Sequence, residues 1–191
     1  MNRLTRVPLS DETTERLKEL KMALFGSVDM YSSREKEVIS ASSQANCHTY
    51  AVIDAMQRSD ISVLLNAYDT EWSCLWKGES EQQFAFYAPY IVKLEANSPF
   101  TDWLLNNSWG KGWGIYLRSY ATLDTVTHHL RKFNQIYDEV NGQWLLFRYY
   151  APVSIKTLLP FLPAKEFIEF THGLTQILSE DPEDKTTLLV I

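Results

Sequence analysis

Between Thr49 and Phe133, short apolar runs alternate with segments in which apolar residues recur every three or four positions. The runs TYAVIDAM, WSCLW, PYIVKLE and the second half of WGKGWGIYLRSY predict strands, because each is short and is bounded by polar or glycine-rich residues. The stretches SDISVLLNAY and NSPFTDWLL predict helices, and in the second Ser98 is a good N-cap with Pro99 at the first helical position. Strands that alternate with helices favour an α/β fold, a central sheet flanked by helices, with a mixed α+β fold as the alternative.

A further amphipathic helix is predicted to begin after Thr122, which is a suitable N-cap. Helical spacing gives this segment one apolar and one polar face. The apolar face contains Leu123, Val126, Leu130 and Phe133; the polar face contains Asp124, His128 and Arg131; His129 lies at the boundary.

A β-hairpin is predicted around Asn141-Gly142, because this dipeptide favours a two-residue turn between apolar runs. Such a turn would place Tyr137 opposite Leu146. The second run, QWLLFRYY, is apolar on both faces, so we expect it to be covered on both sides. Arg148 would then lie mid-strand, and a guanidinium on a covered face must find a partner. An internal ion pair is the simpler interpretation, and anchoring of a partner protein is the alternative.

The pattern divides the chain into three segments. Residues 1–46 hold a helix that begins near Ser10 and a serine-rich polar linker. Residues 47–150 form the α/β core. Residues 151–191 form a small C-terminal helical lobe with two helices, followed by the polar stretch SEDPEDK and a short apolar end.

Composition excludes several classes of function. The 191-residue chain has a formal net charge of −6 and no basic stripe, so no nucleic-acid partner is expected. It has no apolar run near the roughly 18–20 residues needed to span a bilayer, so no membrane partner is expected. Without a secretory signal, and with Cys47 and Cys74 outside any Cys-x-x-Cys pair, a cytoplasmic location is expected. Aromatic residues make up 13% of the chain, which fits either a core or an interface.

The sequence holds no complete catalytic or cofactor motif. His128 and His129 are adjacent and point about 100° apart on a helix, whereas helical metal pairs sit four residues apart, so no metal site is expected. Phosphate-binding and dinucleotide-binding glycine patterns are absent, so no cofactor is expected. One alternative is a hydrolase or transferase that uses Cys74 with a histidine of the 128–129 pair and Asp124. Against it, an apolar strand raises the pKa of a thiol.

Six motifs occur in a specific order: TYAVIDAM, APYIVKLE, PFTDWLL, WGKGWGIYLRS, THHLRKF and LFRYYAP. In order and spacing they resemble the adaptor-chaperone family of bacterial type VI secretion systems, the Tap/TEC-type proteins, over about Thr49 to Gly173. One departure is Ala151-Pro152, where the family commonly has Asp-Pro. The matching positions are Asp54, Ala88, Pro89, Tyr90, Trp103, Trp109, Gly110, Gly114, His129, Leu130, Arg131, Arg148, Tyr149, Tyr150 and Pro152.

The resemblance implies a cytoplasmic, non-enzymatic protein without a cofactor. It would bind a specific effector, often near the N-terminus of that effector, and load it onto the VgrG spike. Two segments are candidates for the apolar contact surface: the tryptophan-glycine loop and the C-terminal helix pair. The possible partner-binding or signature residues are Pro89, Tyr90, Trp103, Trp109, Trp113, His129, Arg131, Arg148, Tyr149, Tyr150, Phe161, Phe167 and Phe170.

Overall fold

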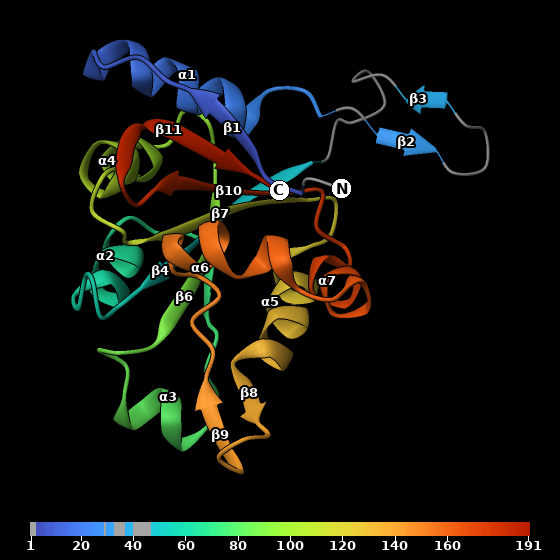
Figure 1. The fold of residues 1–191 in the computed structure, drawn as a ribbon. Helices are drawn as coiled ribbons and strands as arrows, with labels where there is room; N and C mark the ends of the chain where they lie inside the picture. The colour runs from blue at the N-terminus through green and yellow to red at the C-terminus, as the bar shows by residue number, and fades with distance from the viewer. Residues whose placement is uncertain (1–2, 29, 33–36, 40–46) are drawn as a thin grey trace.

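A computed structural model describes residues 3–28, 30–32, 37–39 and 47–191. Its centre is a seven-stranded sheet in the order β1-β11-β10-β7-β4-β6-β5, in which every neighbouring pair is antiparallel (Figure 1). The strands are β1 (Thr5–Pro8), β4 (His48–Asp54), β5 (Trp72–Cys74), β6 (Pro89–Leu94), β7 (Gly114–Ser119), β10 (Gln176–Asp181) and β11 (Asp184–Val190). The fold is therefore mixed α+β, the second of the two arrangements that the sequence left open.

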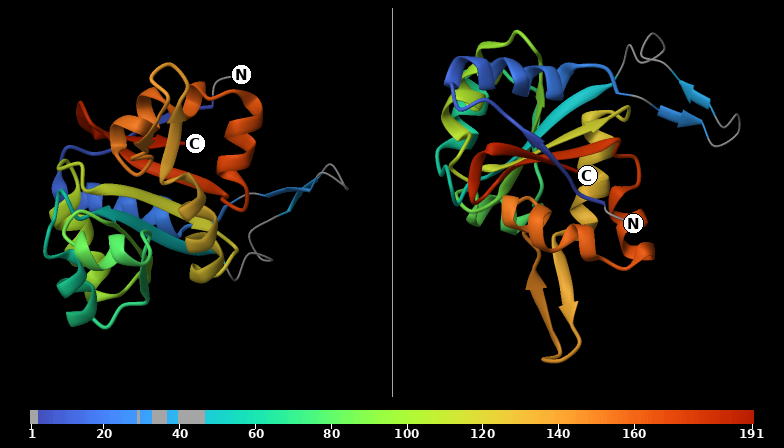
Figure 2. Two further views of the ribbon diagram at one scale, coloured as in Figure 1. Left: turned by 90° about the horizontal axis from the view of Figure 1, so that it is seen from below. Right: turned by 45° about the horizontal axis from the view of Figure 1, so that its top comes forward.

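Helices cover both faces of this sheet. On one face, α1, α2 and α4 contribute to one buried cluster, and on the other α5, α6 and α7 contribute to a second (Figures 1 and 2). The helices are α1 (Thr13–Phe25), α2 (Ile61–Ala67), α3 (Glu79–Gln83), α4 (Pro99–Ser108), α5 (Leu123–Leu130), α6 (Pro152–Thr157) and α7 (Ala164–Thr171), with 3₁₀ turns at Arg131–Phe133 and Leu159–Phe161. The predicted caps are confirmed, since the side chains of Ser98 and Thr122 accept hydrogen bonds from backbone N–H groups of α4 and α5.

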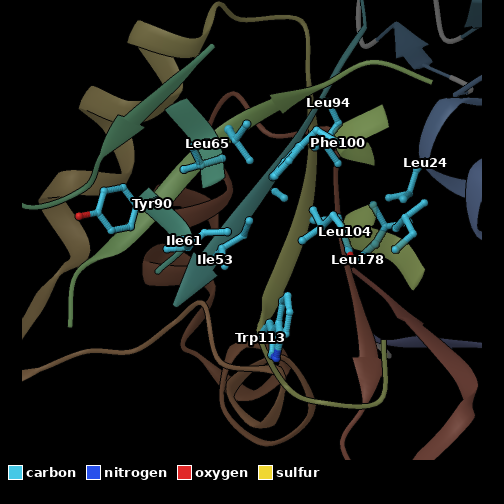
Figure 3. Close-up of a cluster of buried hydrophobic side chains, with 14 of the residues drawn as sticks. Leu24, Ile53, Ile61, Leu65, Tyr90, Leu94, Phe100, Leu104, Trp113 and Leu178 are labelled. Atoms are coloured by element: carbon cyan, nitrogen blue, oxygen red, sulfur yellow. The ribbon is translucent and has the colours of Figure 1, made fainter. Parts of the chain in front are cut away.

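Strand β4 shows how the sheet joins the two clusters. Successive side chains of a strand point to opposite faces. Tyr50 and Val52 therefore belong to one cluster, and Ala51 and Ile53 to the other. Figure 3 shows Ile53 in the cluster that also contains Leu24 of α1, Ile61 and Leu65 of α2, Phe100 and Leu104 of α4, and Leu94 of β6. A Cβ at Gly114 would collide with the Val52 carbonyl, so the approach of β7 to β4 requires glycine there.

The two ends of the chain contribute to the same sheet. Neither β1 nor the β10–β11 pair was predicted, because their sequences are rich in polar residues. Glu180 and Asp181, from the polar stretch SEDPEDK, are buried in β10 with partners. Glu180 accepts hydrogen bonds from two N–H groups of the tryptophan-glycine loop, at Gly110 and Gly112, and Asp181 pairs with Lys156 at 2.7 Å.

The N-terminal helix begins later than predicted. Ser10 lies before it, and the Glu12 side chain caps α1 by accepting hydrogen bonds from the Thr14 and Glu15 N–H groups. Beyond α1, the expected linker contains a short strand pair, β2 (Met30–Ser32) and β3 (Glu37–Ile39). The linker residues 29, 33–36 and 40–46 lie outside the described residues. No described helix combines the length and apolar character that crossing a bilayer requires.

The predicted hairpin exists, but its turn and environment differ from the prediction. It consists of β8 (Gln135–Asp138) and β9 (Gln143–Leu146), which form a separate two-stranded sheet with Tyr137 opposite Trp144. The loop has four residues, because the Asp138 carboxylate accepts hydrogen bonds from the N–H groups of Val140 and Asn141 and from the Asn141 side chain. The Gly142 N–H then donates to the Asp138 carbonyl at 2.8 Å, with φ +63° at Gly142.

The hairpin projects from the rest of the molecule, as Figure 2 (right) shows. All four residues of β9 are exposed, so the prediction that this strand is covered on both sides is wrong within the described chain. Strand β9 also ends at Leu146, so Arg148 is not mid-strand.

Candidate partner-binding site

The hairpin forms one side of a large apolar groove. Its volume is about 1010 Å³. The lining residues come from the hairpin, from the α3 segment and from the turns after β4, β5 and α5. They are Met56, Leu75, Trp76, Lys77, Phe84, Tyr87, Arg131, Lys132, Asn134, Gln135, Trp144 and Leu146. In Figure 1 the α3 segment and the hairpin lie together at the end of the molecule opposite α1.

The hairpin wall presents large apolar side chains to solvent. Trp144 is 66% exposed and Leu146 is 48% exposed. The Trp144 ring contacts the Tyr137 ring, with 5.3 Å between the two centroids. Exposed apolar patches on a protein often mark partner sites, so these side chains are a candidate contact surface. A two-stranded hairpin is also only marginally stable by itself in water, so a partner that covered it would stabilise it.

The opposite wall carries aromatic residues that follow α3. Phe84 and Tyr87 both line the groove, and both are about half exposed. They could not be recognised as site residues from the sequence, because QQFAFYAP has neither helical nor strand periodicity. The one available signal was the density of aromatic residues in a segment between two predicted strands.

An ion pair joins the end of the hairpin to the central sheet. Arg148 follows the hairpin directly and pairs with Asp54, whose side chain is only 2% exposed. The other carboxylate oxygen of Asp54 accepts a hydrogen bond from the N–H of Met56, a lining residue of the groove, at 2.9 Å. The predicted pairing of Arg148 is therefore confirmed. Because Asp54 closes β4, this pair fixes the base of the hairpin relative to the sheet.

Two groove-lining side chains donate hydrogen bonds to backbone carbonyls at the end of β5. The Arg131 guanidinium donates to the Cys74 carbonyl at 2.6 Å, and the Asn134 amide donates to the Leu75 carbonyl at 2.7 Å. Arg131 was predicted on the polar face of its helix with Asp124 and His128. The α-helix ends at Leu130, and the Arg131 guanidinium contacts β5.

Four of the five aromatic residues predicted for partner contact are buried or partly buried. Trp113 and Phe170, named as interface candidates, are core residues. Trp109 is half-buried and donates to the Lys185 carbonyl, and Phe167 packs beneath the guanidinium of Arg3, 4.3 Å from its ring centroid. Of these five candidates only Phe161 is largely exposed, at 77%, and it lies outside the groove.

The remaining signature residues have structural partners. Trp103 stacks on the ring of an α4 neighbour, Phe100. His129 shares a hydrogen bond of 2.8 Å with the Phe170 carbonyl, and His128 is exposed, as predicted. Pro89, Tyr90, Tyr149 and Tyr150 are buried. Of the signature set, only Arg131 lines the groove.

Two residues of the catalytic alternative, Cys74 and His129, lie in environments that do not favour catalysis. Burial raises the pKa of the Cys74 thiol to about 11, so almost none of it is thiolate near neutral pH. The His129 ring hydrogen bonds the Phe170 carbonyl and packs edge-on against Phe133, with centroids 5.1 Å apart. Within the described ranges, no group of three or more His, Cys, Asp or Glu residues is arranged to hold a metal ion.

Residues 49–167 match a family model described as "Domain of unknown function (DUF4123)". The match covers more than half of the chain. The chain belongs to the DUF4123 family. No curated protein and no solved structure matches it. All groove-lining residues fall inside the DUF4123 range, as do Asp54 and Arg148. Strands β1, β10 and β11 and helix α1 fall outside that range.

Proposed function

We propose that this protein is a cytoplasmic adaptor that binds one effector of a type VI secretion system and delivers it to the VgrG spike. The observation that carries the proposal is the apolar groove between the hairpin and the α3 segment. The six-motif resemblance supplies the class of partner, and DUF4123 membership is consistent with it.

The groove has the features of a protein-binding surface. Contiguous exposed apolar patches on a soluble protein usually mark partner sites, and aromatic anchors dominate binding energy at such sites. Trp144, Tyr87 and Phe84 converge there with the flexible side chain of Met56. Methionine adapts its shape to a partner, which suits a surface that must fit another chain.

In this proposal the protein performs no catalysis. Its work is to cover an apolar part of the effector that would otherwise be exposed before secretion. The raised pKa of Cys74 supports this role over the hydrolase or transferase alternative. Because affinity depends on a few buried anchors and not on the area of contact, one groove of this size can hold a dedicated partner.

The proposal is tested by deleting the gene and comparing the secreted proteins of mutant and wild-type cells by mass spectrometry. We expect one effector to disappear from the secreted fraction while the others remain, and we expect co-expression with this protein to raise the soluble yield of that effector. Secretion of every effector from the deletion strain, or loss of all of them, would contradict a dedicated adaptor.

A further inference from the structure

The groove has a charge that is opposite in sign to the charge of the protein. The whole chain carries 24 acidic and 18 basic residues. Among the residues that the structure describes, the groove lining instead contains Lys77, Arg131 and Lys132 and no carboxylate. The acidic residues of the neighbouring α3, Glu79 and Glu81, lie outside the lining. A cationic margin around an apolar groove on an acidic protein is a specific feature and needs an explanation.

The three cationic side chains differ in whether they already have a partner within the protein. The Arg131 guanidinium is fixed by its hydrogen bond to the Cys74 carbonyl. Lys77 and Lys132 are exposed, and in the described part of the chain neither ammonium group forms a salt bridge. Both are therefore available to a ligand that reaches the groove.

We propose that the groove binds an apolar segment of the effector that is flanked by aspartate or glutamate residues. This inference rests on the proposed adaptor function and adds the chemistry of the bound segment. The apolar side chains of the segment would pack between Trp144 and Tyr87, while its carboxylates would face Lys77 and Lys132. Charge complementarity of this kind selects partners and accelerates their association.

The test uses the full chain and a phage-displayed library of random 16-residue peptides. Peptides enriched on the wild-type protein are sequenced, synthesised and titrated by fluorescence anisotropy. The titrations use the wild type, the double variant Lys77→Glu with Lys132→Glu, and the control Lys18→Glu with Lys185→Glu. The control makes the same change in net charge at exposed lysines outside the groove. Thermal melts of all three proteins check that each is folded.

We expect enriched peptides to combine an apolar cluster with at least two neighbouring carboxylates. Their affinity should fall about tenfold or more in the groove variant and change less than twofold in the control, because reversed charges repel the flanking carboxylates. The inference is overturned if no peptide is enriched, if the enriched peptides lack acidic residues, or if both double variants bind equally.

Binding of a single-stranded oligonucleotide to the groove in preference to the peptides would also overturn it. So would dimerisation of the wild type through the same lysines. The secretion assay reads the adaptor function separately. A lost effector together with peptides that lack carboxylates would therefore reject only the charge rule.

Discussion

Strands β4 and β9 share an apolar pattern but lie in opposite environments. Both are apolar on two faces. In β4 the side chains from Tyr50 to Ile53 are at most 2% exposed, whereas Leu145, the least exposed apolar residue of β9, is 38% exposed. Helices of the same chain cover both faces of β4. The part of the chain that the structure describes places no helix over β9. An apolar pattern on both faces therefore does not show that helices of the same chain cover a strand. In the proposed function, a partner covers β9.

The largest expected difference between the sheet and the hairpin is in the stability cost of two matched leucine substitutions. Leu117 in β7 is fully buried, and Leu146 in β9 is half exposed. Leu117→Ala should lower the free energy of unfolding by about 2–5 kcal/mol, because it leaves a cavity in a packed core. Leu146→Ala should lower it by less than about 1 kcal/mol. Chemical denaturation of both variants checks this, and equal losses would show that the hairpin belongs to the core.

Two arginine substitutions measure how much the ion pair between the sheet and the end of the hairpin stabilises the fold. Arg148→Ala removes the cation that pairs with buried Asp54. We expect the free energy of unfolding to fall by about 2 kcal/mol, less than for a fully buried pair, because the Arg148 side chain is one-third exposed. Arg6→Ala should cost less than about 1 kcal/mol, because its partner Asp181 keeps Lys156. The melting temperatures of the two variants measure these losses. A larger drop for Arg6→Ala than for Arg148→Ala would contradict the account.

Acid should affect the hairpin turn locally. Hydrogen bonds from the Asn141 side chain and backbone lower the pKa of Asp138 below its usual value. Because the folded pKa is lowered, the stabilisation is present at neutral pH and is lost as the pH falls below about 4. The NMR signal of the Trp144 indole should shift toward its unfolded position over that range, while the buried Trp113 signal stays in place. Simultaneous movement of both signals would indicate a global transition.

The smallest expected effect concerns the two thiols. Cys74 is buried in the sheet with a raised pKa of about 11, and Cys47 is partly exposed. Iodoacetamide at pH 8 should therefore modify Cys47 well before Cys74, because the thiolate is the reacting form. Peptide mapping by mass spectrometry measures both rates. Fast labelling of Cys74 would reopen the catalytic alternative.

The sequence predicted the elements whose local signals agree with their final packing. Caps and apolar periodicity located α4, α5 and β6, and the need of a guanidinium for a partner predicted the pairing of Arg148. Strands β10 and β11 were not predicted, because their stability depends on residues that are distant in the sequence. Glu180 is acceptable inside the sheet only because the tryptophan-glycine loop, some seventy residues earlier, supplies N–H donors.

The location of the candidate site could not be predicted for a related reason. Aromatic residues look alike in sequence whether they fill a core or face a partner, and the fold decides which is which. The tryptophan-glycine loop packs on the sheet, whereas the aperiodic stretch at Phe84 and Tyr87 stays exposed. The turn residues were recognised, but the carboxylate of Asp138 extended the loop and shifted the register of the hairpin.

The most direct test of the central claim, that the uncovered hairpin binds the effector, is a titration of the effector identified in the secretion assay against three forms of this protein. These are the wild type, Trp144→Ala, and the control Met22→Ala at an exposed site on α1, at the other end of the molecule. Isothermal calorimetry should show a loss of about thirtyfold or more in affinity for Trp144→Ala, because removal of an anchor aromatic costs about 2 kcal/mol or more. Met22→Ala should bind within twofold of the wild type. Full affinity of Trp144→Ala for the effector, with unchanged folding, would contradict the account.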